Sequence, residues 1–251
     1  MTLAEIAPLH RFSRICVLTG AGLSGAAGLP TFRGPDGVWT LSPELELAMD
    51  GLRIRENLDA VWRVWSGILA AALAAGPTAA HRALAASGGT IVTQNVDTLH
   101  TLAGSDAIEL HGSAGRARCM ECRWRSVVIA GRSGVEVIPG IVVPDAVAGT
   151  NGLPACPRCG SAVRPDVVLF NEQLPKGALE AAQVAAQECE LFLAIGTSGT
   201  VAPASFLVSL ARAAGALCVN LSLHPPAMVN PAFDEQVTAD AEVELPAWLE
   251  S

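Results

Sequence analysis

The sequence predicts an α/β fold in which a smaller domain is inserted into a doubly wound parallel sheet. Three observations support this fold class. Short apolar runs of strand length alternate with segments of helical character, which is typical of parallel sheets. A glycine-rich turn directly follows the first run. Two C-x-x-C pairs lie in a segment rich in glycine and proline that interrupts the alternation. The 251 residues suffice for one large core and a small module.

The first predicted strand is Ile15–Thr19, a short apolar run that suits a buried position. The stretch that follows, Gly20–Gly34, reads GAGLSGAAGLPTFRG, and Pro30 ends any helix within it. Glycines after a strand let backbone N–H groups approach a pyrophosphate at a helix N-terminus. This turn therefore indicates a dinucleotide site in a Rossmann-like sheet, although close packing also requires glycines. Phe32 and Arg33 lie in a loop that we expect to cover the cofactor.

Further strands are predicted at Gly89–Thr93, Leu191–Ile195 and Ala216–Val219. A helix is expected over Pro203–Ala214, and an amphipathic helix over Asn57–Ala75. The carboxyl ends of parallel strands meet at one edge of a sheet, where ligands bind. The strand ends that point to this one crevice are Gly20, Gln94, Gly196 and Asn220.

The C-x-x-C pairs predict a metal site. Cys119 and Cys122 form one pair, Cys156 and Cys159 the other, with 33 residues between them. Two such pairs complete a tetrahedral Zn(Cys)4 shell, whereas a redox site needs only one. We expect one structural Zn²⁺, which is not catalytic because its shell is closed. The other cysteines lie in apolar patterns typical of a core, at Cys16, Cys189 and Cys218.

The composition of the chain indicates which kinds of binding partner are not expected. The net charge is −8, and Lys176 is the single lysine, so a strong nucleic-acid backbone binder is not expected. No secretory signal and no apolar run of membrane-spanning length is expected, so we expect no membrane partner. Seven cysteines without a signal favour a reducing compartment. We therefore expect a cytoplasmic protein, and the acidic surface favours a monomer.

Taken together, the motifs resemble those of sirtuins, the NAD-dependent protein-lysine deacylases. Thr19–Trp39 resembles the first cofactor motif of that family and Thr93–His100 (TQNVDTLH) the second, and Leu110–Gly112 carries the family's catalytic histidine. The resemblance covers about residues 12–249. The remaining motifs follow in family order: the C-x-x-C pairs, RPDVVLF at Arg164–Phe170, GTSGTVAPA at Gly196–Ala204 and VNLS at Val219–Ser222.

The resemblance implies two domains. Residues 1–34, 77–112 and 164–251 would form the NAD-binding domain. Residues 35–76, a helical module, and 113–163, a zinc-ribbon module, would form the small domain.

The resemblance also implies a reaction. The oxygen of an acyl-lysine would displace nicotinamide from NAD, and His111 would act as general base on the ribose hydroxyls. The products would be nicotinamide, free lysine and O-acyl-ADP-ribose. Asn95 and Asp97 complete the expected catalytic set. The other histidines are expected to be structural: His10, His81, His100 and His224.

The family positions give the expected binding residues. The cofactor set is Gly20, Ala21, Gly22, Ser24, Phe32, Arg33, Trp39, Gln94, Asn95, Asp97, Gly196, Thr197, Ser198, Asn220, Ser222 and Ala241. The extended stretch of Val167, Val168, Leu169 and Phe170 would pair with the backbone of an acyl-lysine protein or peptide. Asn171 follows it, where the family commonly has glycine.

The acyl pocket departs from one subgroup of the family. Sirtuins that prefer succinyl- or malonyl-lysine carry a Tyr-x-x-Arg pair on the helix after the cofactor loop. The matching positions here are Trp65 and Ile68, neither of which pairs with a carboxylate. Losing such a pair costs about 1.5–3 kcal/mol. We expect a pocket for acetyl or longer neutral chains. Both residues also suit the core face of a helix, and Arg53 or Arg63 could supply a charge.

Two alternative functions stay open at this point. The same NAD site could serve a protein mono-ADP-ribosyltransferase, because another nucleophile can attack the same carbon. The chain could also be a non-catalytic NAD-sensing protein. The presence of His111 favours deacylation over transfer, and the set of Asn95, Asp97 and His111 argues against a mere sensor.

Overall fold

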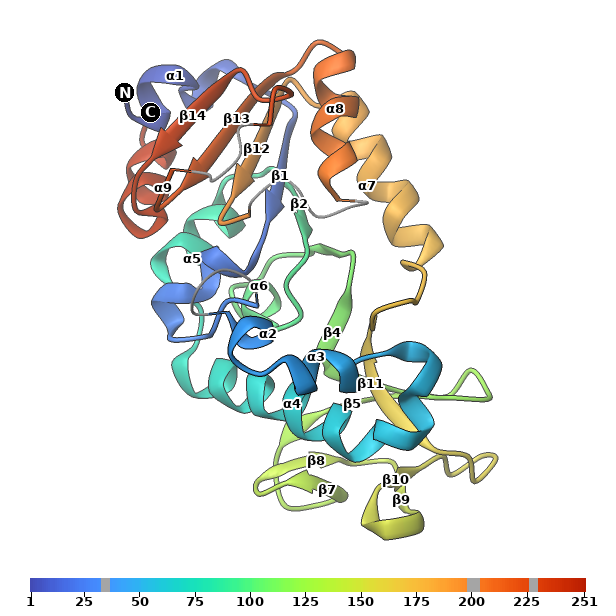
Figure 1. Cartoon of the computed structure of the whole chain (residues 1–251). Coiled ribbons are helices and arrows are strands. Elements are labelled where there is room, and N and C mark those ends of the chain that lie inside the picture. Colours follow the sequence, from blue (N-terminus) through green and yellow to red (C-terminus); the bar gives the residue numbers. More distant parts are fainter. Residues whose placement is uncertain (33–36, 198–203, 226–229) are drawn as a thin grey trace.

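The computed structural model of the chain describes residues 1–32, 37–197, 204–225 and 230–251. These residues form two domains. In Figure 1 the larger one, with a parallel sheet, lies at the top, and the smaller one, with helix α4 and short antiparallel strands, lies at the bottom. This arrangement confirms the predicted fold class.

The large sheet has six parallel strands in the order β14-β13-β12-β1-β2-β3. Strand β1 pairs with both β12 and β2, so the direction in which the strands are added reverses at β1. Ligands bind at the carboxyl ends of the strands beside such a reversal. The strands are β1 (Ile15–Thr19), β2 (Thr90–Thr93), β3 (Ile108–Glu109), β12 (Leu191–Ile195), β13 (Leu217–Ser222) and β14 (Glu235–Thr238).

Helices cover both faces of this sheet, because its strands are apolar on both sides. Ile15 and Val17 of β1 belong to the core under α1, α5 and α9, whereas Cys16 and Leu18 belong to the core under α7 and α8. Cys189 and Cys218 are also buried in this second core, as predicted. The helices are α1 (Leu3–Ile6), α5 (Ala79–Ala86), α7 (Lys176–Glu188), α8 (Ser205–Ala213) and α9 (Ala241–Leu249).

Strand β13 is longer than predicted. The expected strand ends at Val219, but the observed one continues to Ser222 because β14 pairs with it, Asn220 lying opposite Gln236. Asn220 is therefore inside a strand and 2% exposed, not at a strand end. The sequence pattern does not predict β3, β14 or α5.

The small domain contains a three-stranded antiparallel sheet in the order β11-β4-β5. Strand β11 (Val163–Val167) pairs with β4 (Gly112–Cys119). The expected domain boundary after residue 163 differs from the structure, because β11 pairs with β4 and its residues enter the small-domain core. Its other elements are α2 (Val38–Leu41), α3 (Pro43–Ala48), β5 (Arg125–Val127), β6 (Ile129–Ala130), β7 (Val135–Ile138), β8 (Ile141–Val143), β9 (Val147–Ala148) and β10 (Pro154–Ala155).

Helix α4 (Ile54–Ala75) is the longest helix of the small domain and begins before the predicted Asn57. By length and composition, Gly51–Ala75 is apolar enough to cross a membrane, which differs from our expectation. One side of α4 packs into the small-domain core, and the indole Nε1–H of Trp62 donates to the Val163 carbonyl at 3.0 Å. Its buried residues recur at helical spacing: Ile54, Leu58, Val61, Trp62, Trp65, Ser66, Leu69 and Ala72.

Candidate active site and zinc centre

The crevice forms where the turns after β1 and β12 touch. The Gly22 N–H donates to the Gly196 carbonyl at 2.9 Å. A Cβ atom on Gly20 or Gly22 would lie only 2.8 Å from the Gly196 oxygen. Gly196 itself has φ +60°, which a residue with a side chain rarely adopts. These glycines are therefore required by the close approach of the two turns, whatever ligand binds.

A cavity of about 870 Å³ opens at this point, between the two domains. It takes side chains from the ends of β1, β2 and β12 and from the small domain. Most of the predicted site residues line it: Gly20, Ala21, Gly22, Phe32, Trp39, Trp65, Gln94, Asn95, His111, Val167, Val168, Leu169, Phe170, Gly196 and Thr197.

His111 lies between β3 and β4, where the chain passes from the large domain to the small one. Its Nδ1 is 2.9 Å from the Gln94 carbonyl oxygen. Because a carbonyl only accepts, Nδ1 carries the proton and Nε2 holds the lone pair. Burial lowers the pKa of His111, and the hydrogen bond to Gln94 opposes this shift. The ring is therefore neutral near pH 7 and can accept a proton at Nε2.

Asn95 is held from several sides. Its Nδ2 donates to the Gly20 carbonyl at 3.1 Å and to Ser24 Oγ at 3.2 Å. The Ser24 hydroxyl in turn donates to Asp97 Oδ2 at 2.7 Å. Asp97 Oδ1 accepts the Leu99 N–H at 3.0 Å. The predicted Ser24, Asn95 and Asp97 thus form one hydrogen-bonded group.

This group borders a small hollow of about 10 Å³ next to the main cavity. Ile68 lines this hollow, not the main cavity that Trp65 lines. The two residues expected to form the acyl pocket are therefore on different sides of Phe32, which lines both spaces. The hollow is lined by Ala21, Ser24, Leu29, Pro30, Phe32, Ile68, Asn95, Val96 and Asp97.

Four aromatic rings gather on the small-domain side of the cavity. Trp39 is the centre of this group: its ring centroid is 5.2 Å from Phe32, 6.5 Å from Trp65 and 5.9 Å from Phe170. Trp39 and Trp65 are 7% and 6% exposed. The group makes this part of the cavity apolar.

The stretch expected to pair with a substrate backbone is already partly paired. The Val168 N–H donates to the His111 carbonyl at 2.9 Å. The Phe170 N–H donates to the Met49 carbonyl at 3.0 Å, and the Phe170 carbonyl accepts the Gly51 N–H at 2.9 Å. A substrate strand would therefore have to use other backbone groups of this segment.

Asn171 adopts the left-handed conformation, with φ +65°, which explains why glycine also suits this position. Its Nδ2 donates to Asp50 Oδ1 at 3.0 Å. That hydrogen bond is the main reason why the pKa of Asp50 is lowered. The substitution of the family glycine thus adds a tie between the two segments that border the cavity.

Some expected cofactor residues lie elsewhere. Arg33 and Ser198 fall outside the described residues. Asn220, Ser222 and Ala241, all of them described, do not line the main cavity. The sequence reasoning missed several lining residues. Thr31 and Val96 lie inside the two cofactor motifs, and Asn171 and Glu172 lie next to the RPDVVLF motif, so these four had a signal in the sequence. The missed set is Thr31, Met49, Val96, Asn171, Glu172, Gln173, Leu174, Lys176 and Leu179.

The four cysteines of the C-x-x-C pairs come together at one point. All their sulfur atoms lie within 4.8 Å of one another. The Sγ atoms of Cys119 and Cys159 are 3.5 Å apart, and those of Cys122 and Cys156 3.6 Å. Zn–S bonds of about 2.3 Å place the sulfur atoms of a tetrahedral shell about 3.8 Å apart. The donor set therefore fits one structural Zn²⁺.

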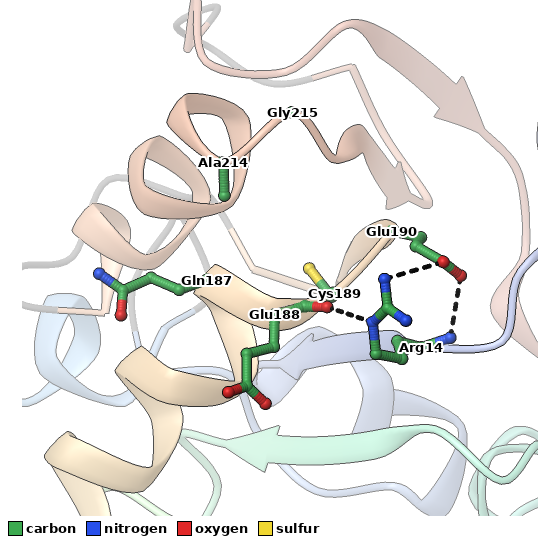
Figure 2. A pocket seen from close by; sticks show the side chains of 7 residues that line it. All are labelled: Arg14, Gln187, Glu188, Cys189, Glu190, Ala214 and Gly215. Carbon is green, nitrogen blue, oxygen red and sulfur yellow. Dashed lines mark hydrogen bonds and ion pairs between the residues drawn. The ribbon is translucent and has the colours of Figure 1, made fainter.

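A second hollow, of about 450 Å³, lies at the opposite, amino ends of the strands (Figure 2). Arg14 crosses it and pairs with Glu190 at 2.9 Å, and its Nε donates to the Glu188 carbonyl at 2.7 Å. Burial raises the pKa of the Cys189 thiol there to about 11, so this thiol stays protonated. The Arg14 guanidinium is thus bound by Glu190 and by the Glu188 carbonyl.

The chain matches known proteins over nearly its whole length. The sequence model described as the Sir2 family matches residues 20–203. The NAD-dependent protein deacylase 2 of Pyrobaculum aerophilum is 39% identical over 253 residues, covering 98% of this chain and 94% of that protein. The NAD-dependent protein deacylase 1 of Pseudomonas aeruginosa is 40% identical over 223 residues, covering 84% of each.

Solved structures give the same result. A complex of a Sir2 homologue with NAD superposes with a TM-score of 0.83 at 28% identity, covering 100% of this chain and 93% of that one. A Sir2 complex with a p53 peptide and NAD⁺ has a TM-score of 0.77 at 26% identity, covering 100% and 98%. With the cavity at the reversal point of the sheet, His111 at its wall and the four-cysteine centre, these matches show that the chain belongs to the Sir2 family, the sirtuins.

Proposed function

We propose that this protein is an NAD-dependent protein-lysine deacylase that removes neutral acyl groups, with His111 as general base. The observation that carries the proposal is the hydrogen bond between His111 Nδ1 and the Gln94 carbonyl, which leaves Nε2 free to accept a proton in a residue that lines the cavity. Relatives named NAD-dependent protein deacylases at 39–40% identity support the same activity.

The residues present fit NAD. When bound, NAD supplies an ADP-ribosyl group through the breakage of its bond to nicotinamide. The turn of Gly20, Ala21 and Gly22 would hold the pyrophosphate, since small residues let the backbone approach it. Asn95 and Asp97, which line the hollow beside the cavity, would border the nicotinamide side of the bound NAD. The residues that we propose to bind the adenosine half of NAD are Thr197, Asn220, Ser222 and Ala241.

Asn220 supplies an independent observation that favours NAD. Its Oδ1 is buried and has no hydrogen-bond partner among the described residues. A buried acceptor without a donor is costly. A hydroxyl or amino group of a bound adenosine would satisfy it.

His111 would take a proton from a ribose hydroxyl at Nε2. The imidazolium formed keeps its Nδ1–H on the Gln94 carbonyl, which stabilises the positive charge and holds the ring in place. Asn95 would help to orient the ribose, because its own amide is fixed by Gly20 and Ser24. Water completes the reaction, releasing lysine and O-acyl-ADP-ribose.

The aromatic group of Phe32, Trp39, Trp65 and Phe170 favours a neutral acyl chain. A carboxylate placed among these rings would lose its hydration without gaining a cation. Among the described residues that line the cavity, Lys176 is the one cation, and its side chain is 89% exposed and 3.7 Å from Glu180. The Lys176 ammonium therefore lies at the exposed rim of the cavity, where it already pairs with Glu180.

The remaining expectations are part of the proposal. The protein would act in the cytoplasm as a monomer, with no nucleic-acid or membrane partner. The net charge of −8 supports the absence of a nucleic-acid partner. The packing of α4 into the small-domain core supports a structural role for this apolar helix.

The test is mass spectrometry of one peptide carrying acetyl-, butyryl-, myristoyl- or succinyl-lysine, incubated with the protein and NAD. Removal of neutral acyl groups with formation of O-acyl-ADP-ribose is expected. A preference for succinyl-lysine would contradict the neutral pocket but not the reaction. Transfer of ADP-ribose to protein, or NAD binding without turnover, would contradict the proposed reaction.

A further inference from the structure

Two buried histidines face each other outside the catalytic cavity. His81 lies on α5 and His100 on α6 (Leu99–Leu102), and they are 0% and 3% exposed. Their ring centroids are 4.9 Å apart, with an angle of 62° between the rings. His81 is tied to its own helix, because its Nδ1 is 2.8 Å from Oγ1 of the N-cap residue Thr78. The mechanism above uses neither ring.

A chain of hydrogen bonds leads from His100 to the catalytic loop. His100 Nε2 is 2.9 Å from Thr19 Oγ1, at the end of β1. The Thr19 hydroxyl donates to Thr93 Oγ1 at 2.8 Å, and the Asn95 N–H donates to the same Thr93 oxygen at 3.0 Å. Because the one hydroxyl hydrogen of Thr19 is used, His100 must donate its Nε2–H. Every group in this chain is buried.

This direction fixes the state of the His100 ring. His100 must be neutral with its proton on Nε2, so its Nδ1 is an acceptor. That Nδ1 and the Nε2 of His81 have no hydrogen-bond partner among the described residues. Burial lowers the pKa of His100 to about 3 and also lowers that of His81, against the charges of Asp97 and Glu242. Both rings therefore stay neutral near pH 7.

We propose that His100 is a positioning residue for the NAD reaction, acting through Thr19 and Thr93 on the backbone of Asn95. This inference rests on the proposed function. Asn95 lines both the main cavity and the small hollow. Its backbone N–H is anchored by Thr93, so a shift of that anchor moves the side chain that orients the reacting ribose. His81 packs against the His100 ring and keeps its Nε2 directed at Thr19.

The test compares substitutions that differ only in hydrogen bonding. Thr19→Val keeps the shape of the side chain and removes the hydroxyl, whereas Thr19→Ser keeps the hydroxyl. His100→Leu removes the donor, whereas His100→Gln keeps an amide N–H near the position of Nε2. The readouts are kcat and KM for NAD in nicotinamide release, together with the Kd for the acyl-peptide. Zinc content and the midpoint of urea unfolding show whether each variant folds.

We expect Thr19→Val and His100→Leu each to lower kcat for nicotinamide release by about tenfold, the effect of losing one buried hydrogen bond in a positioned site. Acyl-peptide Kd should stay unchanged, and Thr19→Ser and His100→Gln should restore most of the rate. The double variant of Thr19→Val and His100→Leu should be no slower than the slower single variant, because both break one chain.

Three results would overturn the inference. One is an unchanged kcat in both Thr19→Val and His100→Leu. Another is a Ser or Gln variant that is as slow as its apolar counterpart, which would assign the effect to packing. The third is additive losses in the double variant. A wild-type protein that releases no nicotinamide would contradict the proposed function itself, whereas an active wild type with unaffected variants contradicts this inference alone.

Discussion

The hydrogen bond from His111 Nδ1 to the Gln94 carbonyl determines which ring nitrogen can work as a base. At the scale of single residues, this bond connects the fold to the chemistry. Gln94 directly follows β2, so the end of a strand that builds the sheet also sets the tautomer of the histidine. Nε2 is left to take the proton.

His111→Ala should lose deacylation while keeping the fold and the zinc. Removing a positioned general base lowers the rate by about 10²- to 10⁴-fold. The measurement is lysine release from an acetyl-peptide, with zinc content and urea unfolding as controls. Deacylation at the wild-type rate would contradict the assignment of His111 as base.

The pH dependence of the same step follows from the lowered pKa of His111. Burial lowers this pKa below the ordinary value of 6.5. A base works in its neutral form, so activity is kept as the pH falls to 6.5 and is lost only below it, through the lowered pKa. A profile of kcat/KM against pH measures this acid limb. A limb centred above pH 6.5 would show that His111 is not the titrating group.

Site residues could be predicted from the sequence where they belong to a motif, because a motif specifies both the type of each residue and its distance along the chain from the others. Asn95 and Asp97 come together through Ser24, the four cysteines form one group, and His111 lines the same cavity as Asn95. Met49 could not be predicted, since it reaches the cavity only because Phe170 bonds to its carbonyl. Trp65 and Ile68 separate because Phe32, distant in sequence, lies between the two spaces.

At the scale of elements, the zinc centre would add to a core to which few of the short strands contribute: Ile141 and Val143 of β8 are buried in it, whereas β6 and β9 are exposed. Strands β9 and β10 have two residues each, and several strands between Cys122 and Cys156 are largely exposed. Strand β4 ends at Cys119, and Cys156 directly follows β10. A metal that binds both ends therefore fixes the loop-rich segment between them.

Cys156→Ser should remove the zinc and destabilise the small domain. Loss of one thiolate leaves three ligands, and structural zinc sites contribute directly to folding. Metal analysis of the purified protein and its thermal unfolding measure the two effects. Cys189→Ser is the matched control, because Cys189 is also buried but is no ligand, and its metal content should be normal. Normal zinc in Cys156→Ser would contradict the four-cysteine site.

The segment after β11 is held by an ion pair in which the arginine is buried and the glutamate is 22% exposed. Arg164 is 2% exposed, and its Nη2 lies 3.0 Å from Glu172 Oε2, which also accepts the Leu169 N–H at 2.8 Å. Glu172 lines the cavity. The pair thus joins the small-domain sheet to the wall of the active site.

Glu172→Leu should lower the free energy of unfolding by about 3–5 kcal/mol, because it leaves the Arg164 charge buried without its partner. Glu180→Leu is the control: the Glu180 side chain is 60% exposed and pairs only with the rim residue Lys176. Its effect should be within about 1 kcal/mol. Urea unfolding of both variants makes the comparison, and equal losses would contradict the role of the Arg164–Glu172 pair.

Elements with a strong apolar period were predictable and short ones were not. β1 and β12 agree with the expected Ile15–Thr19 and Leu191–Ile195 residue for residue. β3 has only two residues, too few for a pattern. The residue at which β13 ends depends on its pairing with β14, and the local sequence of β13 gives no information about this pairing.

At the scale of the whole molecule, the chain passes between the two domains four times, after β1, α4, β3 and β11. The insertion was predictable because the cysteine segment interrupts the alternation of strands and helices. The position of its second boundary was not, because β11 joins the small sheet only through its pairing with β4. The cavity lies at these passages, so His111 and Phe170 belong to segments that connect the domains.

The pairing of β1 with β12 also has a consequence for how the protein is made. Ile15 finds its partner Leu191 only after most of the chain has left the ribosome, and Trp248 closes the structure by donating to the Ala7 carbonyl at 2.7 Å. Domains of many proteins fold in turn during synthesis. Here β1 stays unpaired on one side until β12, which lies in the last quarter of the chain, has been synthesised. Ribosome-bound chains halted before β12 should therefore be cut rapidly by protease, and resistance should arise only once α9 has emerged; early resistance would contradict this order.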